Sequence, residues 1–256
     1  MEYQKQQNRD KVKFVVLIAV VLVIAVFVVS VLLSKPAGKP ADSTATPETT
    51  AEAPNGTFLI LDKELEAAIC EQLGIAQVTQ QDVESLTVLD CGERTITALT
   101  GLEFATGLKE LTAKVDVSTF QPLWGLALDR LTLSCEYSLQ TQLEDLSKIK
   151  RLKALDLTDC GISSVGYLSE LPQLEELVLD QNKIFYLSYF NGMSGLKKLS
   201  LRGCSIDSIA EMAGNAGIRQ IDLRDNEITD LYVLETFFSL EQAETAGNPP
   251  QEENVE

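Results

Sequence analysis

The fold of this chain is decided by four consecutive stretches of 22 residues: LKALDLTDCGISSVGYLSELPQ (152–173), LEELVLDQNKIFYLSYFNGMSG (174–195), LKKLSLRGCSIDSIAEMAGNAG (196–217) and IRQIDLRDNEITDLYVLETFFS (218–239). Each has apolar residues at positions 1, 4, 6, 11 and 14, and usually at position 17. The same frame extends back to starts at Leu86, Leu108 and Leu128, and forward to a partial unit from Leu240 to Asn248. The units from Leu108 and Leu128 have 20 and 24 residues. These eight units predict a repeat protein whose neighbouring units share one core.

The first half of each unit fits LxxLxLxxNxL, the pattern of leucine-rich repeats. Its LxxLxL part predicts a short strand whose side chains point alternately into and out of the coil. Position 9 is normally Asn, because its side-chain amide satisfies backbone groups where the strand turns. Here position 9 holds Arg94, Asp116, Glu136, Cys160, Asn182, Cys204, Asn226 and Asn248. We therefore predict an α/β solenoid of short parallel strands over residues 86–248, with Cys160 and Cys204 substituting for Asn in a buried ladder.

The segment before the repeats is FLILDKELEAAICEQLGIAQVTQQDVESLTVLD (58–90), in which Leu61, Leu65, Ile69 and Leu73 fall on one helical stripe. With this segment and the repeats, residues 57–248 resemble the internalin-type leucine-rich-repeat proteins of Gram-positive bacteria. The resemblance implies a helical N-terminal cap over residues 57–85 and a curved solenoid that binds other proteins by its concave strand face. The chain departs from that family in having no immunoglobulin-like domain after the repeats and no wall-anchoring motif. The resemblance therefore supports a fold and a binding role, and not a host-cell receptor.

A run of 20 residues, Phe14–Leu33, is apolar except for Ser30. As a helix it spans about 30 Å, the thickness of the hydrocarbon core of a bilayer. The alternative is a cleaved signal peptide, whose apolar region has about 7–15 residues. Basic residues precede the run at Lys5, Arg9, Lys11 and Lys13. We predict a single-pass anchor at 14–33 in the cell membrane, with residues 1–13 cytoplasmic and the repeats extracellular. Residues 34–56, rich in Pro, Thr and Ala, predict a disordered stalk, and residues 249–256 a polar tail.

Composition excludes several classes of function. The net charge is −17, and from Thr57 onward 15 Lys and Arg face 33 Asp and Glu, which argues against nucleic acid as a partner. The chain has no His and no recognisable catalytic, nucleotide or metal-binding motif, so we predict neither an enzyme nor a cofactor or metal site. Five Cys without CxxC spacing indicate no disulfide framework. Cys70 and Cys91 can pair if the leading helix lies over the first coil. Cys160 and Cys204 lie two coils apart, which is too far for a disulfide.

Two surfaces are candidates for partner binding. Strand positions 3, 5 and 7 face solvent, and there Lys198, Arg202 and Arg224 form a predicted basic patch for an acidic partner segment, such as an envelope-polymer phosphate. The alternative is an ordinary solvated face with paired charges. The same face carries further charged candidates, namely Arg130, Asp156, Asp180 and Asp222.

The second candidate surface is aromatic. Phe185, Tyr186 and Tyr189 lie at positions 12, 13 and 16 of one unit, and Tyr167 matches Tyr189 one unit earlier. Exposed aromatic clusters are typical of interface centres, and the alternative is that these rings cover the convex edge. The sequence thus predicts a protein-recognition module displayed outside the cell for adhesion or sensing. The alternatives are a scaffold or spacer in an envelope assembly without a discrete ligand, and an intracellular regulatory subunit, which the anchor opposes.

Overall fold

The computed structural model describes residues 58–251. The predicted membrane segment 14–33 and stalk 34–56 lie outside the described residues. Between residues 58 and 251 the helices are too short or too polar to cross a bilayer.

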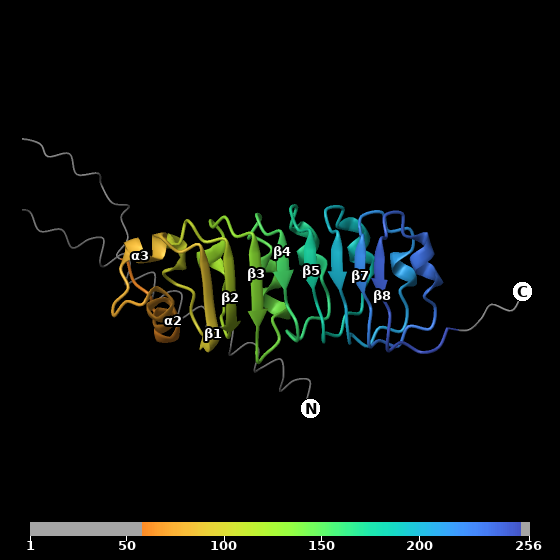
Figure 1. The fold of residues 1–256 in the computed structure, drawn as a ribbon, viewed down its shortest axis with the longest axis horizontal. Coiled ribbons are helices and arrows are strands. Elements are labelled where there is room, and N and C mark those ends of the chain that lie inside the picture. Colours follow the sequence, from red (N-terminus) through yellow and green to blue (C-terminus); the bar gives the residue numbers. More distant parts are fainter. Residues whose placement is uncertain (1–57, 252–256) are drawn as a thin grey trace, which may run out of the picture. The chain divides into compact units, whose positions relative to one another are not determined.

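The described chain forms one parallel sheet of eight strands in strict sequence order (Figure 1). The strands are β1 (Val88–Ile96), β2 (Glu110–Val115), β3 (Arg130–Ser134), β4 (Ala154–Asp156), β5 (Glu176–Val178), β6 (Lys198–Ser200), β7 (Gln220–Asp222) and β8 (Gln242–Glu244). Each strand pairs with the strands before and after it, so every repeat unit is one coil, numbered below by its strand. The predicted set of eight short parallel strands is confirmed.

Short helices make the return half of the coils. They are α4 (Leu143–Leu146) and the 3-10 helices Leu102–Phe104, Gln121–Leu123, Gln140–Gln142, Gly166–Glu170, Ser188–Gly192, Ala210–Met212 and Tyr232–Thr236. The five 22-residue coils have little chain between one strand and the next. A 3-10 helix suits this return path because it forms in short pieces of three to five residues.

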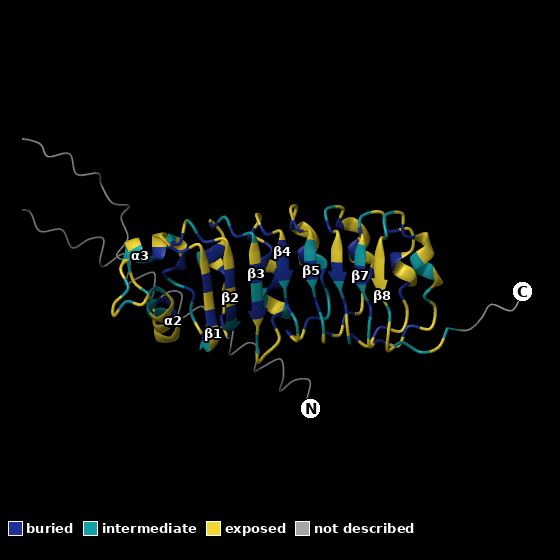
Figure 2. Cartoon of the chain, in the orientation of Figure 1, coloured by how far each residue is buried: buried dark blue, intermediate teal, exposed yellow. Residues whose placement is uncertain are grey.

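The register of the sheet places equivalent leucines side by side. Leu155 pairs with Leu177, Leu177 with Leu199, and Leu199 with Ile221. All four are buried. Their burial, together with that of positions 1 and 6, removes apolar surface from water continuously along the stack, which is the main stabilising contribution in repeat folds. Figure 2 shows buried and exposed residues alternating along the strands, as side chains of an extended backbone must.

The N-terminal end of the sheet is covered by α2 (Lys63–Leu73), followed by α3 (Gln80–Glu84), and α2 packs beside β1. Asp62 caps α2 by accepting hydrogen bonds from the backbone N–H groups of Glu64 and Leu65, and Gly74 ends it with a φ of 68°. Leu65 and Ile69 are fully buried. Leu61, which was expected on the same stripe, is 59% exposed. It precedes the capping residue, so the helical stripe begins one turn later.

The turn after the strand differs between early and late coils. In coils 4 to 8 the residue at position 8 has a φ between 52° and 83°, which lets the chain reverse directly after a three-residue strand. These residues are Asp159, Gln181, Gly203, Asp225 and Gly247. Coils 2 and 3 have Val115 and Cys135 at this position, and neither has a positive φ. Their strands continue further before the chain turns.

This difference corrects the predicted position-9 column in its first three members. Asp116 and Glu136 are exposed, and Arg94 forms an ion pair with Glu71 on α2. In these coils the inward column is instead occupied by Ile96, Val115 and Cys135. The continuing strand moves the inward-facing side chain by one residue or more, since alternate residues of a strand point to opposite sides.

Candidate functional site

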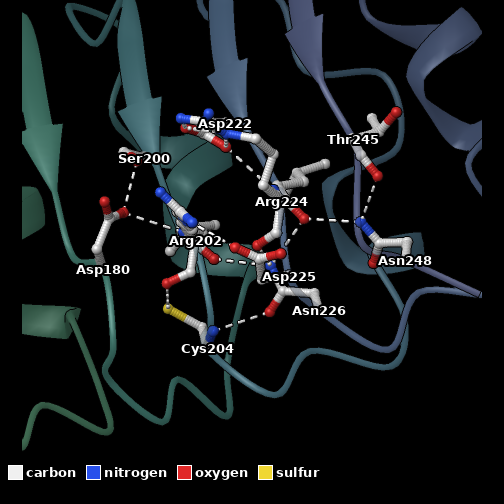
Figure 3. A network of polar contacts seen from close by, with 12 residues as sticks. Asp180, Ser200, Arg202, Cys204, Asp222, Arg224, Asp225, Asn226, Thr245 and Asn248 are labelled. Carbon is white, nitrogen blue, oxygen red and sulfur yellow. Dashed lines mark hydrogen bonds and ion pairs between the residues drawn. The ribbon is translucent and has the colours of Figure 1, made fainter.

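The strand face, meaning the solvent-facing side of β1 to β8, is supported from within by the position-9 ladder (Figure 3). Asn226 shows how a ladder residue works. Its Oδ1 accepts hydrogen bonds from the N–H groups of Cys204 (2.9 Å) and Ile206 (3.1 Å) in the previous coil. Its Nδ2 donates to the carbonyls of Leu201 (2.8 Å) and Leu223 (2.9 Å). One amide therefore satisfies buried backbone groups of two coils and fixes the strand ends at the edge of the strand face.

Cys160 and Cys204 occupy the same column, as predicted from the repeat. Both are buried, and the Sγ of Cys204 lies 3.2 Å from the carbonyl oxygen of Leu179, the group that an Asn amide would bind. Cys160 makes the equivalent contact with Leu133 at 3.5 Å. Burial raises the pKa of the Cys204 thiol to about 11, so this thiol stays neutral at physiological pH. A thiol thus replaces the donor of Asn but leaves the ladder with fewer hydrogen bonds.

Lys198 and Arg130 converge on one carboxylate of the strand face. Glu176 lies between them, with Lys198 Nζ 2.8 Å and Arg130 Nη2 3.1 Å from its carboxylate oxygens. The hydrogen bond from Lys198 lowers the pKa of the Glu176 carboxyl, which therefore remains charged. The two bases and the acid come from coils 3, 5 and 6, which shows that side chains two coils apart meet on this face.

Arg202 and Arg224 are also paired (Figure 3). Arg202 Nε lies 2.6 Å from Asp225 Oδ2, and Arg224 Nε lies 3.0 Å from Asp222 Oδ1. Burial raises the pKa of the Asp222 carboxyl, but its hydrogen bonds from Arg224 outweigh burial and lower that pKa. The three bases of the predicted basic patch thus each contact a carboxylate. This arrangement corresponds to the alternative of a solvated face with paired charges.

The remaining predicted carboxylates bind backbone and hydroxyl groups near their own strands. Asp180 accepts hydrogen bonds from the hydroxyl of Ser200 and from the backbone N–H of Arg202 (3.0 Å). Asp156 accepts from the N–H (2.9 Å) and hydroxyl (2.7 Å) of Thr158. These contacts hold the strand ends in place and use the acceptor oxygens that point toward the turns.

A hollow of about 270 Å³ lies on the strand face over β5 to β8. It is lined by Glu176, Leu177, Val178, Lys198, Leu199, Ser200, Gln220, Ile221, Asp222, Gln242 and Glu244. Among the predicted site residues the hollow brings together Lys198 and Asp222, whereas Arg202, Arg224 and Asp180 are not part of its lining. The sequence reasoning overlooked Gln220, Gln242 and Glu244. Gln220 and Gln242 lie at strand position 3, where charged residues alone were considered, and Glu244 lies at position 5 of the partial last unit, whereas only the seven complete units were considered.

The predicted aromatic cluster divides into two pairs. Phe185 and Tyr186 are 61% and 56% exposed, and Lys183 Nζ lies 5.8 Å from the ring centre of Phe185. Tyr167 and Tyr189 instead line a second hollow of about 400 Å³ together with Gln140, Ser164, Gly166 and Glu170. The Tyr189 ring packs on Gly166, where an added Cβ would lie 3.3 Å from the ring Cζ. The structure therefore brings the two matched tyrosines together, as the repeat predicts.

Within residues 58–251, no cluster of three or more His, Cys, Asp or Glu is arranged to hold a metal ion. All five cysteines, Cys70 and Cys91 included, are free thiols. Cys91 is buried in the core of coil 1, and burial raises the pKa of its thiol to about 12. Cys70 on α2 and Cys91 are therefore not joined, although α2 packs beside β1.

Comparison with known proteins gives the fold a family context. No family model and no curated protein matches the sequence. Internalin C2 of Listeria monocytogenes is structurally similar, with a TM-score of 0.63, 25% identity, and coverage of 76% of this chain and 87% of that chain. A second Listeria monocytogenes internalin has a TM-score of 0.54 and 20% identity, and covers 73% of this chain and 69% of its own. A leucine-rich-repeat protein of Leptospira interrogans has a TM-score of 0.51 and 19% identity, with 66% and 51% covered. The chain is a leucine-rich-repeat protein of the kind that serves as a protein-interaction module.

Proposed function

We propose that this chain recognises a protein partner through its strand face, with the hollow over β5 to β8 at the centre of the contact. The single observation that carries this proposal is the composition of that hollow. Val178 is the apolar side chain of its lining that is partly exposed, and Glu176, Lys198 and Glu244 supply charge around it, while the core residues Leu177, Leu199 and Ile221 lie buried beneath. An apolar centre with a polar surround is the usual anatomy of a protein-binding surface. The charges are already oriented by their partners, so binding loses little side-chain entropy.

The charge of the hollow indicates the chemistry of the partner. Its lining contains three carboxylates, Glu176, Asp222 and Glu244, and one base, Lys198, which is paired with Glu176. A partner segment with basic or amide groups complements this balance better than the acidic segment expected from the sequence, since approaching carboxylates would repel the acids. The internalin-type resemblance is consistent with such a binding role.

We further propose that the module is displayed from a membrane. The apolar run 14–33 with its basic flank at 1–13 supports a single-pass anchor that leaves the repeats outside the cell. The polar stalk 34–56 then separates the repeats from the bilayer. Adhesion or sensing is the role that this arrangement serves.

The proposal is tested with the full-length chain in the cells that produce it. A photo-crosslinking amino acid is placed at Gln220, in the hollow, and in a matched variant at Gln173, an exposed residue outside the lining of the hollow. We expect one protein to be captured at Gln220 and not at Gln173, and its capture to be abolished by Glu244→Lys. Equal capture at both positions, or none at either, favours a scaffold without a discrete ligand.

Membrane display is tested separately by protease treatment of intact cells. Digestion of the repeats from outside supports the proposed orientation. Repeats that are protected until the membrane is broken contradict it and favour an intracellular regulatory subunit. Crosslinking at Gln220 still tests partner binding by the strand face in either case, because its result does not depend on the compartment in which the repeats lie.

A further inference from the structure

Two cysteines of neighbouring coils meet where the early and late coils join. Cys135 follows β3, and Cys160 is the ladder residue of coil 4. Each thiol shifts the pKa of the other, so the two side chains are neighbours, and the Sγ of Cys160 also lies 3.5 Å from the carbonyl oxygen of Leu133, two residues before Cys135. Cys160 is completely buried, whereas Cys135 is partly exposed and packs against the core. The pair therefore consists of one thiol that solvent can reach and one that it cannot.

The backbone explains why these two side chains meet. The last register pair of β2 and β3 joins Lys114 to Ser134, so Cys135 continues the inward column after Val115. In coil 4 the left-handed turn at Asp159, with a φ of 52°, brings position 9 inward instead. The column thus passes from position 8 to position 9 between coils 3 and 4. Both cysteines follow the strands of their coils, since β3 ends at Ser134 and β4 at Asp156. The shift places both side chains in the inward column of adjacent coils, whose strands lie about 4.8 Å apart, and a disulfide needs Cα atoms about 4.4–6.8 Å apart.

We propose that Cys135 and Cys160 are an oxidisable thiol pair, a site at which an exogenous disulfide introduces a bond between coil 3 and coil 4. Cys135 is the attacking thiol because it is the exposed member. The neighbouring Cys160 thiol also lowers the pKa of the Cys135 thiol, while burial and Asp159 act in the opposite direction. The same contact and burial raise the pKa of Cys160, which stays protonated until the second step.

The reaction balances with a disulfide as the oxidant. The Cys135 thiolate attacks one sulfur of the oxidant, the S–S bond of the oxidant breaks, and one thiolate leaves as Cys135 becomes a mixed disulfide. Cys160 then loses its proton to water and attacks the Cys135 sulfur, which expels the second thiolate. The two cysteines together lose two protons and two electrons, and the oxidant becomes two thiols.

The ladder supplies a matched control. Cys204 is buried at the same position of coil 6, and its ladder neighbours are Asn182 and Asn226. It shares the environment of Cys160 but is flanked by amides. Cys160→Asn introduces the residue that the ladder has in coils 5, 7 and 8, so this variant keeps the donor of the ladder and its fold can be verified by thermal unfolding.

The test uses the purified, reduced full-length chain and oxidised glutathione as the oxidant. After trypsin digestion without reductant, we expect peptides 131–148 and 154–183 to be linked, with the loss of about 2 Da that one S–S bond requires. Cys204→Ser should give the same link, and Cys135→Ser and Cys160→Asn should give none. With iodoacetamide at pH 7, Cys135 should react at least about tenfold faster than Cys204. A stable glutathione adduct on Cys135 without the link, a link to another cysteine, or no reaction overturns the proposal.

Discussion

β1, β2 and β3 have nine, six and five residues, whereas β4 to β8 have three each. In the early coils longer runs of strand pairing satisfy the backbone. In the late coils the chain reverses after three residues because position 8 takes a left-handed conformation, and the ladder amides take over the backbone groups released by the turn. The comparison teaches that the left-handed turn at position 8 accompanies short strands, whether Asn or Cys follows it, and that coils without this turn have longer strands.

The largest expected effect comes from breaking the ladder in a late coil. Asn226→Ala should lower the free energy of unfolding by about 3–5 kcal/mol, because buried backbone groups of Cys204, Leu201 and Leu223 lose their partner. Urea unfolding measures this loss. The exposed Gln173→Ala is the control and should change stability by less than about 0.5 kcal/mol. A loss below about 1 kcal/mol for Asn226→Ala would mean that water replaces the amide and that the ladder is dispensable.

The equivalent break at the early end is Asp62→Ala. Asp62 accepts hydrogen bonds from the N–H (2.7 Å) and hydroxyl (2.6 Å) of Thr97, where the chain leaves β1, while also capping α2. We expect a loss of about 2–3 kcal/mol, smaller than that at Asn226 because part of this site reaches water. An unchanged unfolding midpoint would show that the early coils do not depend on this carboxylate.

Asp62 also predicts a pH dependence. Burial raises the pKa of its carboxyl, but the hydrogen bonds from Thr97, Leu65 and Glu64 outweigh burial, so that the pKa lies below the ordinary value of an aspartate. A lowered folded-state pKa gives stability that is complete above the unfolded pKa and is lost as pH falls through the folded pKa. The difference in stability between the natural chain and Asp62→Ala should therefore be constant at neutral pH and shrink below about pH 4. A difference that grows on acidification would contradict the assignment.

A smaller, stabilising effect is expected when an Asn is added to a late coil that lacks one. Cys204→Asn should raise the free energy of unfolding by about 1 kcal/mol, since an amide can donate to Leu179 and Leu201 where the thiol has a single hydrogen. Cys135→Asn should bring no such gain, because its coil lacks the left-handed turn. Chemical denaturation of both variants measures the difference. Equal stabilisation at both positions would show that the Asn acts without the turn.

The smallest effect is expected on the strand face. Lys198→Ala removes an ion pair with Glu176 in which the side chains are 53% and 32% exposed. Such a pair contributes less than about 0.5 kcal/mol, and Arg130 still contacts Glu176 after the change. Unfolding at low and high salt should show this small difference shrinking as salt rises. A loss above about 1 kcal/mol would mean that the face stabilises the solenoid and is not free to serve binding alone.

Much of the fold was predictable, because periodic leucines such as Leu155, Leu177 and Leu199 report directly on a shared core. The Asn column was predictable in the late coils for the same reason. It failed at Asp116 and Glu136, because position 9 faces inward only after a left-handed turn, and Val115 and Cys135 do not make that turn. The backbone conformation at position 8 determines which residue of these coils faces inward. Counting residues in the repeat does not show that conformation.

The candidate site was less predictable than the fold. Lys198 and Asp222, both predicted for the strand face, line one hollow. Arg202 and Arg224 bind Asp225 and Asp222, which is the paired arrangement that the sequence left as the alternative to a basic patch. Pairing depends on side-chain reach across and along coils, which the spacing alone does not give. Uncharged residues such as Gln220 entered the site through their strand position and not through their chemistry.

The strict order of the strands, β1 to β8, has a consequence for how the molecule forms and changes. Each coil packs on the coil that precedes it in the sequence. The chain can therefore fold progressively along its length, without first bringing distant segments together. Because each coil contacts only its neighbours, the number of coils can also change during evolution. A whole coil can be added or removed by a single duplication or deletion in the coding sequence, and the neighbours on either side still meet the surface that they were shaped to meet.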